Sequence, residues 1–264
     1  MELKNKIILV AGAAGLIGSE FSKTLINNGA VCILIDNNTS KLYKLKKQLH
    51  NKPNKIIFKK IDISNEKQII SLKKYLIKNF KKLDCVVNLV ANDPKVNNKK
   101  KKFKTFEDTN LKEFQKDLNI GLTSMMLVIK HSIGLLKKSN KGSVVNMASD
   151  LSIISPDHRI YSNKKKDFNS KPISYSIVKH GVIGLTKYLS TYYGSQNIRF
   201  NSISPSGVLH EQDKMFQKKI SKLIPLGRMA HLNEISSALV YLLSDKSSYT
   251  TGINLVIDGG RSVW

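Results

Sequence analysis

The most informative residues are a tyrosine and a lysine, Tyr175 and Lys179, which lie four positions apart in an apolar stretch. On a helix this spacing puts both side chains on one face. A phenol has an ordinary pKa near ~10, so it exchanges protons poorly at neutral pH unless a nearby cation stabilises its phenolate. Lys179 is placed to supply that cation. Ser149 and Asn119 add polar groups upstream, and we expect Tyr175 to be a proton-transfer group.

A glycine-rich turn near the N-terminus could hold a dinucleotide. The apolar run 7–10 predicts a strand, Gly12, Gly15 and Gly18 follow it, and a helical pattern succeeds them. In a strand–turn–helix unit, glycines allow the backbone to approach a pyrophosphate closely, and the helix N-terminus attracts the anion. Together with a proton-transfer tyrosine, this turn predicts hydride transfer to or from a nicotinamide cofactor.

The second predicted strand ends in Asp36, at the distance expected for a carboxylate that binds the ribose 2′-hydroxyl of adenosine. A carboxylate there would repel the 2′-phosphate of NADP, and asparagines rather than an arginine follow it. Lys41 and Lys44 lie nearby and offset this repulsion only in part. We therefore expect NAD rather than NADP.

Short apolar runs alternate with amphipathic stretches along the chain, which is typical of βα units in a parallel sheet. We expect an α/β protein with a single-domain Rossmann fold over residues 1–264: a doubly wound parallel sheet of about seven strands, helices on both faces, and ligands at the carboxyl ends of the strands. The expected strands are Lys6–Ala11, Val31–Asp36, Lys55–Ile61, Cys85–Val90, Gly142–Ala148, Arg199–Ser204 and Asn254–Ile257. The expected helices include Leu16–Asn27, Asn65–Asn79, one from about Leu111 to Lys137, Ser174–Gly194 and Leu232–Ser244.

Composition argues against several classes of protein. The formal net charge of +25 could indicate a nucleic-acid partner, but the lysines are spread along the chain without the interleaved aromatic residues of a single-strand binding surface. Cys32 and Cys85 lie in apolar runs and are interpreted as core residues, and the six histidines have no ligand spacing, so we expect no metal. No run approaches the roughly 18–20 apolar residues of a membrane helix, and we expect a cytoplasmic protein.

Two segments, 92–110 and 150–172, do not follow the alternation of strand and helix patterns, and each comes after a predicted strand. Loops at that edge of a sheet commonly carry specificity. Both segments contain a lysine run, Lys99–Lys102 in the first and Lys164–Lys166 in the second, which could attract an anionic substrate. A solvated loop explains the same lysines and is the preferred interpretation.

A set of motifs follows the order found in the short-chain dehydrogenase/reductase family, in its shorter branch, and the resemblance covers essentially the whole chain. The motifs are the glycine turn, Asp36, Asp62-Ile63, Asn88-Leu89-Val90-Ala91, Asn119, Ser149, Tyr175-x-x-x-Lys179, Ser204-Pro205-Ser206-Gly207, Pro225-Leu226-Gly227-Arg228 and Asp258-Gly259-Gly260.

The resemblance implies a role for each matched residue. Tyr175 would be the catalytic acid or base, and Lys179 would lower its pKa and hold the nicotinamide ribose. Ser149 would hydrogen-bond the substrate oxygen, and Asn119 would position a water in a proton relay. The implied cofactor-binding residues are Gly12, Ala14, Gly15, Leu16, Ile17 and Asp36; Asp62 and Ile63 beside the adenine; Asn88; Ala91 beside the adenosine ribose; Tyr175 and Lys179; and Pro205, Gly207 and Val208 beside the nicotinamide.

The chain departs from the family pattern in three places. Leu16 stands where the shorter branch usually has its second glycine, a spacing that resembles nucleotide-sugar epimerases and dehydratases. After the fourth strand, Asn88-Leu89-Val90-Ala91-Asn92 replaces the usual Asn-Asn-Ala-Gly. The interval from Ser149 to Tyr175 is about twice the usual one, so we interpret about 150–172 as a substrate-loop insertion. A second pair, Tyr161 and Lys165, has the same spacing as the catalytic pair but lacks an apolar helical pattern.

Three stretches, Ser155-Pro156-Asp157-His158-Arg159-Ile160-Tyr161, Lys171-Pro172-Ile173-Ser174-Tyr175 and the ending Asp258-Gly259-Gly260-Arg261-Ser262-Val263-Trp264, resemble a subgroup encoded among bacterial surface-glycan and flagellin-modification genes. They are also similar to gluconate 5-dehydrogenase-like members. We therefore expect an NAD-dependent oxidoreductase that interconverts a secondary alcohol and a ketone on a sugar, sugar acid or sugar phosphate. Asp157, His158, Arg159 and Tyr161 are the candidate substrate contacts, and structuring of the loop is their alternative role.

Two other functions stay open at this point: a nucleotide-sugar epimerase or dehydratase, suggested by the glycine spacing, and a dinucleotide sensor without catalysis. The long helices, 111–137 and 174–194, resemble those that pair in family oligomers, so we expect a homotetramer or homodimer. The apolar patch Met125-Met126-Leu127-Val128 favours such an association, unless it packs against the chain's own sheet.

Overall fold

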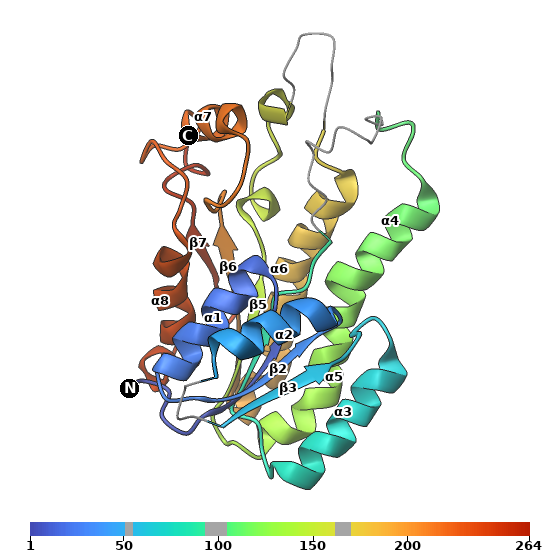
Figure 1. Cartoon of the computed structure of the whole chain (residues 1–264), viewed down its shortest axis with the longest axis vertical. Coiled ribbons are helices and arrows are strands. Elements are labelled where there is room, and N and C mark those ends of the chain that lie inside the picture. The colour runs from blue at the N-terminus through green and yellow to red at the C-terminus, as the bar shows by residue number, and fades with distance from the viewer. Residues whose placement is uncertain (51–54, 93–104, 162–169) are drawn as a thin grey trace.

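The computed structural model describes residues 1–50, 55–92, 105–161 and 170–264. At its centre is a parallel sheet in the order β3-β2-β1-β4-β5-β6-β7, which confirms the doubly wound Rossmann fold (Figure 1). The strands are β1 (Ile7–Ala11), β2 (Val31–Asp36), β3 (Ile56–Lys60), β4 (Cys85–Asn88), β5 (Gly142–Met147), β6 (Ile198–Pro205) and β7 (Asn254–Ile257). The α-helices are α1 (Leu16–Asn27), α2 (Thr39–Gln48), α3 (Glu66–Asn79), α4 (Leu111–Leu118), α5 (Ser124–Lys137), α6 (Ile173–Tyr193), α7 (Lys214–Ser221) and α8 (Leu232–Leu243).

Apolar side chains on both faces of the sheet form two separate cores. Residues of α1, α2 and α8, including Phe21, Leu45 and Leu239, pack on one face. Residues of α3, α5 and α6, including Leu72, Val128 and Val182, pack on the other. The central strands β4, β5 and β6 are buried along their whole length, as expected of parallel strands covered on both faces.

Side-chain caps fix where several helices begin, and so where the loops lie. Asn38, Asn65 and Asn110 each accept a hydrogen bond from a backbone N–H in the first turn of α2, α3 and α4. Asp213 does the same for α7. Such caps satisfy N–H groups that have no partner within the helix.

The order of the strands reverses between β1 and β4: β2 and β3 are added on one side of β1, and β4 to β7 are added on the other. In doubly wound sheets, ligands bind at the carboxyl ends of the strands at this point. The glycine turn after β1, Asp36 at the end of β2, Asn88 at the end of β4 and Ser149 after β5 are all found at that edge.

The long helix expected over 111–137 contains an irregularity. Its first part, α4, passes through a π-helical turn at Asn119–Thr123 before α5 begins. Among the described residues, only this run, Leu111–Lys137, is long and apolar enough to cross a membrane by length and composition. Its buried residues, Met125, Leu127 and Val128 among them, belong to the core beside α3, which is the packing of a core helix.

The same packing explains most of the apolar patch at 125–128, which we expected to favour association between subunits. Met125, Leu127 and Val128 are buried within the chain's own core, and Met126 is the exposed member. The patch therefore gives little support to an oligomer. Both lysine runs, Lys99–Lys102 and Lys164–Lys166, lie outside the described residues.

Candidate active site

The glycine turn between β1 and α1 forms a tight cradle. Gly12 has a φ of +81°, a left-handed conformation that favours glycine. A Cβ on Gly18 would lie 2.9 Å from the carbonyl carbon of Ala13, and closer still to the carbonyl oxygen of Gly12. Helix α1 therefore begins directly against the turn, with Gly15 at its N-cap. The N–H groups at the start of a helix attract anions, so this cradle fits the phosphate site that the sequence predicts.

Asp36 stands beside this cradle. One carboxylate oxygen accepts a hydrogen bond from the N–H of Ala14 at 3.1 Å, and the other accepts one from the N–H of Asn38 at 2.9 Å. The carboxylate thus links the end of β2 to the glycine turn. Its position next to the turn fits a contact with the ribose of a dinucleotide whose phosphates lie on α1.

The other predicted cofactor residues follow the same edge. Asp62 accepts from the N–H and hydroxyl of Ser64, and Ile63 is buried beside it. Asn88 donates from Nδ2 to Oδ1 of Asn146 at 2.9 Å. Leu16 is exposed at the start of α1, whereas Ile17 packs against the core. Ala14 and Ala91 are half-buried.

Lys179 lies within the protein and reaches the strand that ends near Ser149. Its side chain is only 3% exposed, and Nζ donates to the carbonyl oxygen of Met147, the last residue of β5, at 2.8 Å. Ser149 follows two residues later and is also buried. This hydrogen bond therefore holds Lys179 of α6 at the end of β5, two residues before Ser149.

Two ammonium groups lie near the ring of Tyr175. Nζ of Lys179 is 5.6 Å from the ring centroid, and Nζ of Lys171 is 4.2 Å from it. A cation near a phenol favours the phenolate, which is the state that accepts a proton from an alcohol. The sequence predicted Lys179 for this purpose; it gave no role to Lys171, which lies four residues before Tyr175 and just outside α6.

Asn119 begins the π-helical turn between α4 and α5. This turn packs closely on α6, because a Cβ on Gly121 would lie 2.5 Å from Cγ1 of Val178, the neighbour of Lys179. The structure therefore brings the segment of Asn119 to the helix that carries Tyr175 and Lys179. π-turns within α-helices are often found at functional sites.

The segment after β6 completes the carboxyl edge. Pro205 ends the strand, and Val208 forms a bridge with Ala230. Ser206 is buried, and its hydroxyl has no hydrogen-bond partner among the residues that the structure describes. A buried polar atom without a partner is costly, and a bound ligand can supply the missing hydrogen bond. Ser206 is therefore a candidate contact for a ligand bound at the carboxyl edge.

The four expected substrate contacts lie together after Ser149, but they interact mostly with one another or with the core. Arg159 donates from Nε and Nη2 to the two carboxylate oxygens of Asp157, at 2.9 and 2.7 Å. His158 begins a short 3₁₀ turn with Arg159. The ring of Tyr161 stacks on Phe216 of α7 at 5.7 Å and is buried in a small cluster with Ile220 and its neighbours. Contact of these four residues with substrate stays a prediction.

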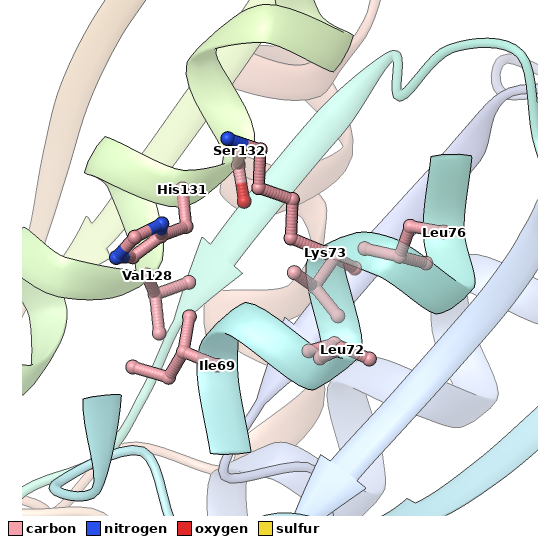
Figure 2. Close-up of a pocket in the computed structure, with 8 residues that line it drawn as sticks. Ile69, Leu72, Lys73, Leu76, Val128, His131 and Ser132 are labelled. Atoms are coloured by element: carbon pink, nitrogen blue, oxygen red, sulfur yellow. The ribbon is translucent and has the colours of Figure 1, made fainter. Parts of the chain in front are cut away.

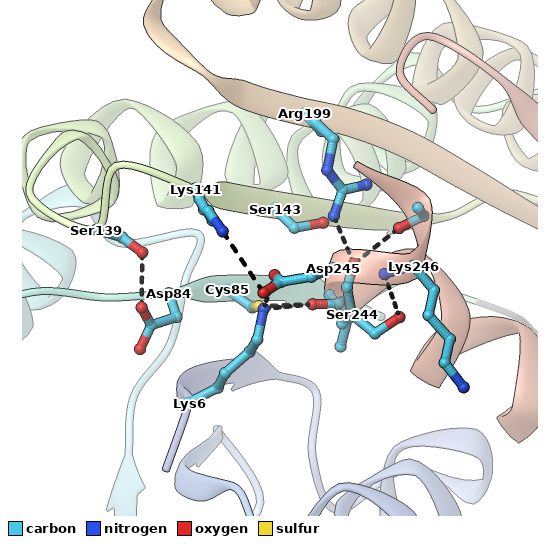
Figure 3. A network of polar contacts seen from close by, with 12 residues as sticks. Lys6, Asp84, Cys85, Ser139, Lys141, Ser143, Arg199, Ser244, Asp245 and Lys246 are labelled. Atoms are coloured by element: carbon cyan, nitrogen blue, oxygen red, sulfur yellow. Dashed lines mark hydrogen bonds and ion pairs between the residues drawn. The ribbon is translucent and has the colours of Figure 1, made fainter. Parts of the chain in front are cut away.

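A second polar cluster in the described residues lies away from this site and has a structural role. Lys6, Asp84, Lys141 and Asp245 meet at the amino ends of the strands, opposite the cofactor edge (Figure 3). Burial raises the pKa of Cys85 there, and that of Cys32, to about 12, so both thiols are inert core groups.

A small space between α3 and α5 is lined by apolar side chains such as Ile69 and Val128 (Figure 2). Its cavity volume is about 10 Å³, the size of one water molecule. It cannot take a dinucleotide. No group of three or more metal-ligating side chains occurs among the residues that the structure describes.

Comparisons with known proteins agree with this arrangement. A family model described as Enoyl-(Acyl carrier protein) reductase matches residues 12–262. The post-translational flagellin modification protein A of Campylobacter coli is 29% identical over 263 residues, which cover 98% of each chain. The D-threitol dehydrogenase of Mycolicibacterium smegmatis is 27% identical over 266 residues, 99% of this chain and 94% of the relative.

Among solved structures, a short chain dehydrogenase from Leptospira borgpetersenii with bound NAD⁺ superposes with a TM-score of 0.85 at 30% identity, covering 99% of this chain and 94% of that one. This likeness extends over the whole Rossmann sheet and the helices on both its faces. With the family match over residues 12–262, it shows that the chain belongs to the short-chain dehydrogenase/reductase family, the NAD(P)-dependent oxidoreductases that act on CH–OH groups.

Proposed function

We propose that the protein is an NAD-dependent dehydrogenase that interconverts a secondary alcohol and a ketone on a sugar, sugar acid or sugar phosphate, in the synthesis of a surface glycan. The observation that carries the proposal is the grouping of Tyr175, two ammonium groups and Ser149 at the carboxyl edge of the sheet. The sugar class is supported by the resemblance to flagellin modification protein A and to a dehydrogenase named for a sugar alcohol.

In the oxidative direction, the Tyr175 phenolate accepts the hydroxyl proton of the substrate. Lys179 and Lys171 stabilise the phenolate electrostatically, and Ser149 hydrogen-bonds the same substrate oxygen. Bound NAD supplies the hydride acceptor. Asn119 and Lys179 lie on packed segments and would pass the proton outward through water. Reduction of a ketone reverses these roles.

Asp36 supports the choice of NAD over NADP. Its carboxylate lies against the glycine turn, where a 2′-phosphate would meet a like charge. The NAD⁺ bound in the Leptospira borgpetersenii structure is consistent with this choice. We expect Asp36→Ala to weaken NAD binding and to reduce the preference for NAD over NADP, measured as the ratio of the two dissociation constants by calorimetry. An unchanged ratio would refute this role for Asp36.

We also propose that the protein works in the cytoplasm as a homotetramer or homodimer. Exposed apolar and aromatic residues on α6, namely Ile177, Tyr188 and Tyr192, support association through this helix. Sedimentation of the wild type and of Tyr188→Glu tests this. A lower mass for the variant is the expected result, and equal masses would exclude the face.

The test of the reaction is NAD reduction, followed by NADH absorbance, across a panel of sugars, sugar acids, sugar phosphates and nucleotide sugars. Tyr175→Phe should lower turnover by about 100- to 10,000-fold, because it removes the proton-transfer group. It should leave NAD binding in place. Tyr188→Phe, on the exposed part of the same helix, is the matched control and should keep full turnover.

Two results would contradict the proposal. Turnover retained by Tyr175→Phe would remove this residue from the chemistry. NAD binding by the wild type without turnover of any panel member would favour a sensor or a substrate of another class.

A further inference from the structure

The helix that carries Tyr175 begins at a proline rather than at a capping side chain. The N-cap of α6 is Pro172, whose ring has no atom that accepts a hydrogen bond, and residues 173–176 include no carboxylate. By contrast, α2, α3, α4 and α7 begin at an asparagine or aspartate that accepts a hydrogen bond from the first turn. The ends of helices fray, and Tyr175 lies in the first turn of α6. Support for this turn must therefore come from outside its own helix.

A carboxylate on a neighbouring helix supplies that support. Helices α4 and α6 pack against each other (Figure 1). In the first turn of α6, Ser174 Oγ donates to Asp117 Oδ2 of α4 at 2.6 Å. Ser174 is only 4% exposed and is the direct neighbour of Tyr175. Hydrogen bonds to a carboxylate are short and strong, and a negative charge is favoured near the N-terminus of a helix. The first turn of α6 is thereby held to α4.

The other oxygen of the same carboxylate holds the segment after β4. Asn92 Nδ2 donates to Asp117 Oδ1 at 2.6 Å. Asn92 follows Ala91, which we expect to border the adenosine ribose of the cofactor. Two residues beyond Asp117, the π-helical turn begins at Asn119. Asp117 thus joins three segments of the candidate site: the one after β4, the π-helical turn and the first turn of α6.

We propose that Asp117 is a positioning residue, which ties the segment after β4 to the first turn of α6 and so sets Tyr175 relative to a bound dinucleotide. This inference rests on the proposed dehydrogenase function. Asp117 acts through its two hydrogen-bond donors and takes no part in the chemistry itself. Lys179 is held separately, by the carbonyl oxygen of Met147, so the tie concerns the tyrosine end of the helix.

The placement of Tyr175 affects turnover more than binding. Oxidation of an alcohol removes a proton from the oxygen and a hydride from the adjoining carbon at one site, so the tyrosine must be placed relative to both substrate and cofactor. A displacement of about 1 Å can lower turnover about 100-fold, although substrate and cofactor still bind. Loss of the tie should therefore lower kcat and leave the affinities for NAD and substrate nearly unchanged.

The experiment compares the wild type with Asp117→Ala, Asp117→Asn, Ser174→Ala, Asn92→Ala and the double variant Asn92→Ala/Ser174→Ala. Asp117→Asn keeps both contacts, because its amide accepts from Ser174 through oxygen and donates to Asn92 through nitrogen once the amide of Asn92 turns over. The matched control is Asn110→Ala, which removes the cap of α4 itself, a hydrogen bond accepted from the N–H of Glu113. This control weakens α4 without breaking the tie.

Each protein is measured in solution by four quantities: the melting temperature, NAD affinity by calorimetry, and kcat and KM for the panel member that the wild type turns over best. Hydrogen–deuterium exchange of residues 177–180 gives a readout that does not depend on turnover. In an α-helix the N–H groups of these residues bond to the carbonyl groups of residues 173–176, so they report the opening of the first turn.

Asp117→Ala should lower kcat by about 10- to 100-fold and change KM and NAD affinity by less than about threefold. Exchange of residues 177–180 should become about tenfold faster, because a hydrogen bond to a charged group is lost. Asp117→Asn should restore both kcat and the exchange rate. The double variant should lose no more kcat than the more severe single variant, because either change already breaks the tie. Asn110→Ala should lower the melting temperature and keep the kcat of the wild type.

Four outcomes would overturn the proposal: a kcat of Asp117→Ala equal to that of the wild type, unchanged exchange of residues 177–180, losses that multiply in the double variant, or an equal loss of kcat in Asn110→Ala. The third would show two independent contacts, and the fourth would assign the effect to the stability of α4. If the wild type turns over no panel member, the proposed dehydrogenase function fails, whereas the exchange rates still decide whether Asp117 holds the first turn of α6.

Discussion

Replacement of Gly18 by alanine tests whether the glycine turn is the cofactor cradle. The added Cβ would lie 2.9 Å from the carbonyl carbon of Ala13 and 3.0 Å from its Cα. Carbon atoms in contact normally lie about 3.5–4.0 Å apart, so α1 and the turn must separate by roughly half an ångström or more. Both neighbours are backbone, and no side chain can rotate to relieve the overlap.

Overpacking of this kind costs about 1–3 kcal/mol, and sometimes more. For a protein of this size each kcal/mol shifts the melting temperature by about 2–4 °C, so Gly18→Ala should melt several degrees below the wild type. The N–H groups of α1 would also move away from a bound pyrophosphate. We expect NAD affinity, measured by calorimetry at a temperature where the variant is folded, to fall by about tenfold or more.

Gly134 provides the matched control. It lies within α5, and beyond its own helix no atom of the described residues comes within 4 Å of the position that its Cβ would occupy. Gly134→Ala should therefore raise stability by about 0.4–1 kcal/mol, because alanine is the better helix former, and leave NAD affinity unchanged. If Gly18→Ala matches the wild type in both melting temperature and NAD affinity, the close approach of α1 to the turn has no role in binding.

Two further substitutions test single contacts. Ser206→Ala removes a buried hydroxyl that has no partner in the described part of the chain, so the free protein should melt no lower than the wild type while NAD binds more weakly. Equal NAD affinity would exclude a contact between Ser206 and the cofactor. Glu234 accepts two hydrogen bonds from Arg228 and one from the N–H of His231, which lower its pKa to about 2. Because the folded-state pKa is the lower one, this contribution to stability is complete above about pH 4.5 and is lost as the pH falls toward 2. The melting temperatures of the wild type and Glu234→Gln should therefore converge over that range, and a constant gap would contradict the ion pair.

Local patterns were sufficient to predict the fold and the side chains at the carboxyl edge. The strand before Gly12, the strand that ends at Asp36, and the helix with Tyr175 and Lys179 each combine apolar periodicity with residues whose chemistry depends on near neighbours in sequence. A parallel sheet then brings the ends of its strands to one edge, so residues far apart in sequence meet without further information.

The π-helical turn at Asn119 shows one limit of such patterns. Over residues 111–137 the apolar spacing is close to that of a regular helix, and a single wider turn changes it too little to be noticed. The reason for the turn lies elsewhere in the chain: Gly121 allows close packing against Val178 of α6. A contact between two helices cannot be predicted from the periodicity of either one.

Asp150 shows a second limit, because its charge alone suggests an exposed position. An isolated carboxylate is costly to bury, and nothing near it in the sequence compensates. The compensating charge is Arg261, which the tight turn of Asp258 to Ser262 directs into the same site. The ion pair could not be predicted from the sequence, because its two members are 111 positions apart. They come together only when β6 and β7 join the sheet. Arg261 of the C-terminal segment thereby supplies the charge that allows Asp150 to lie buried next to Ser149.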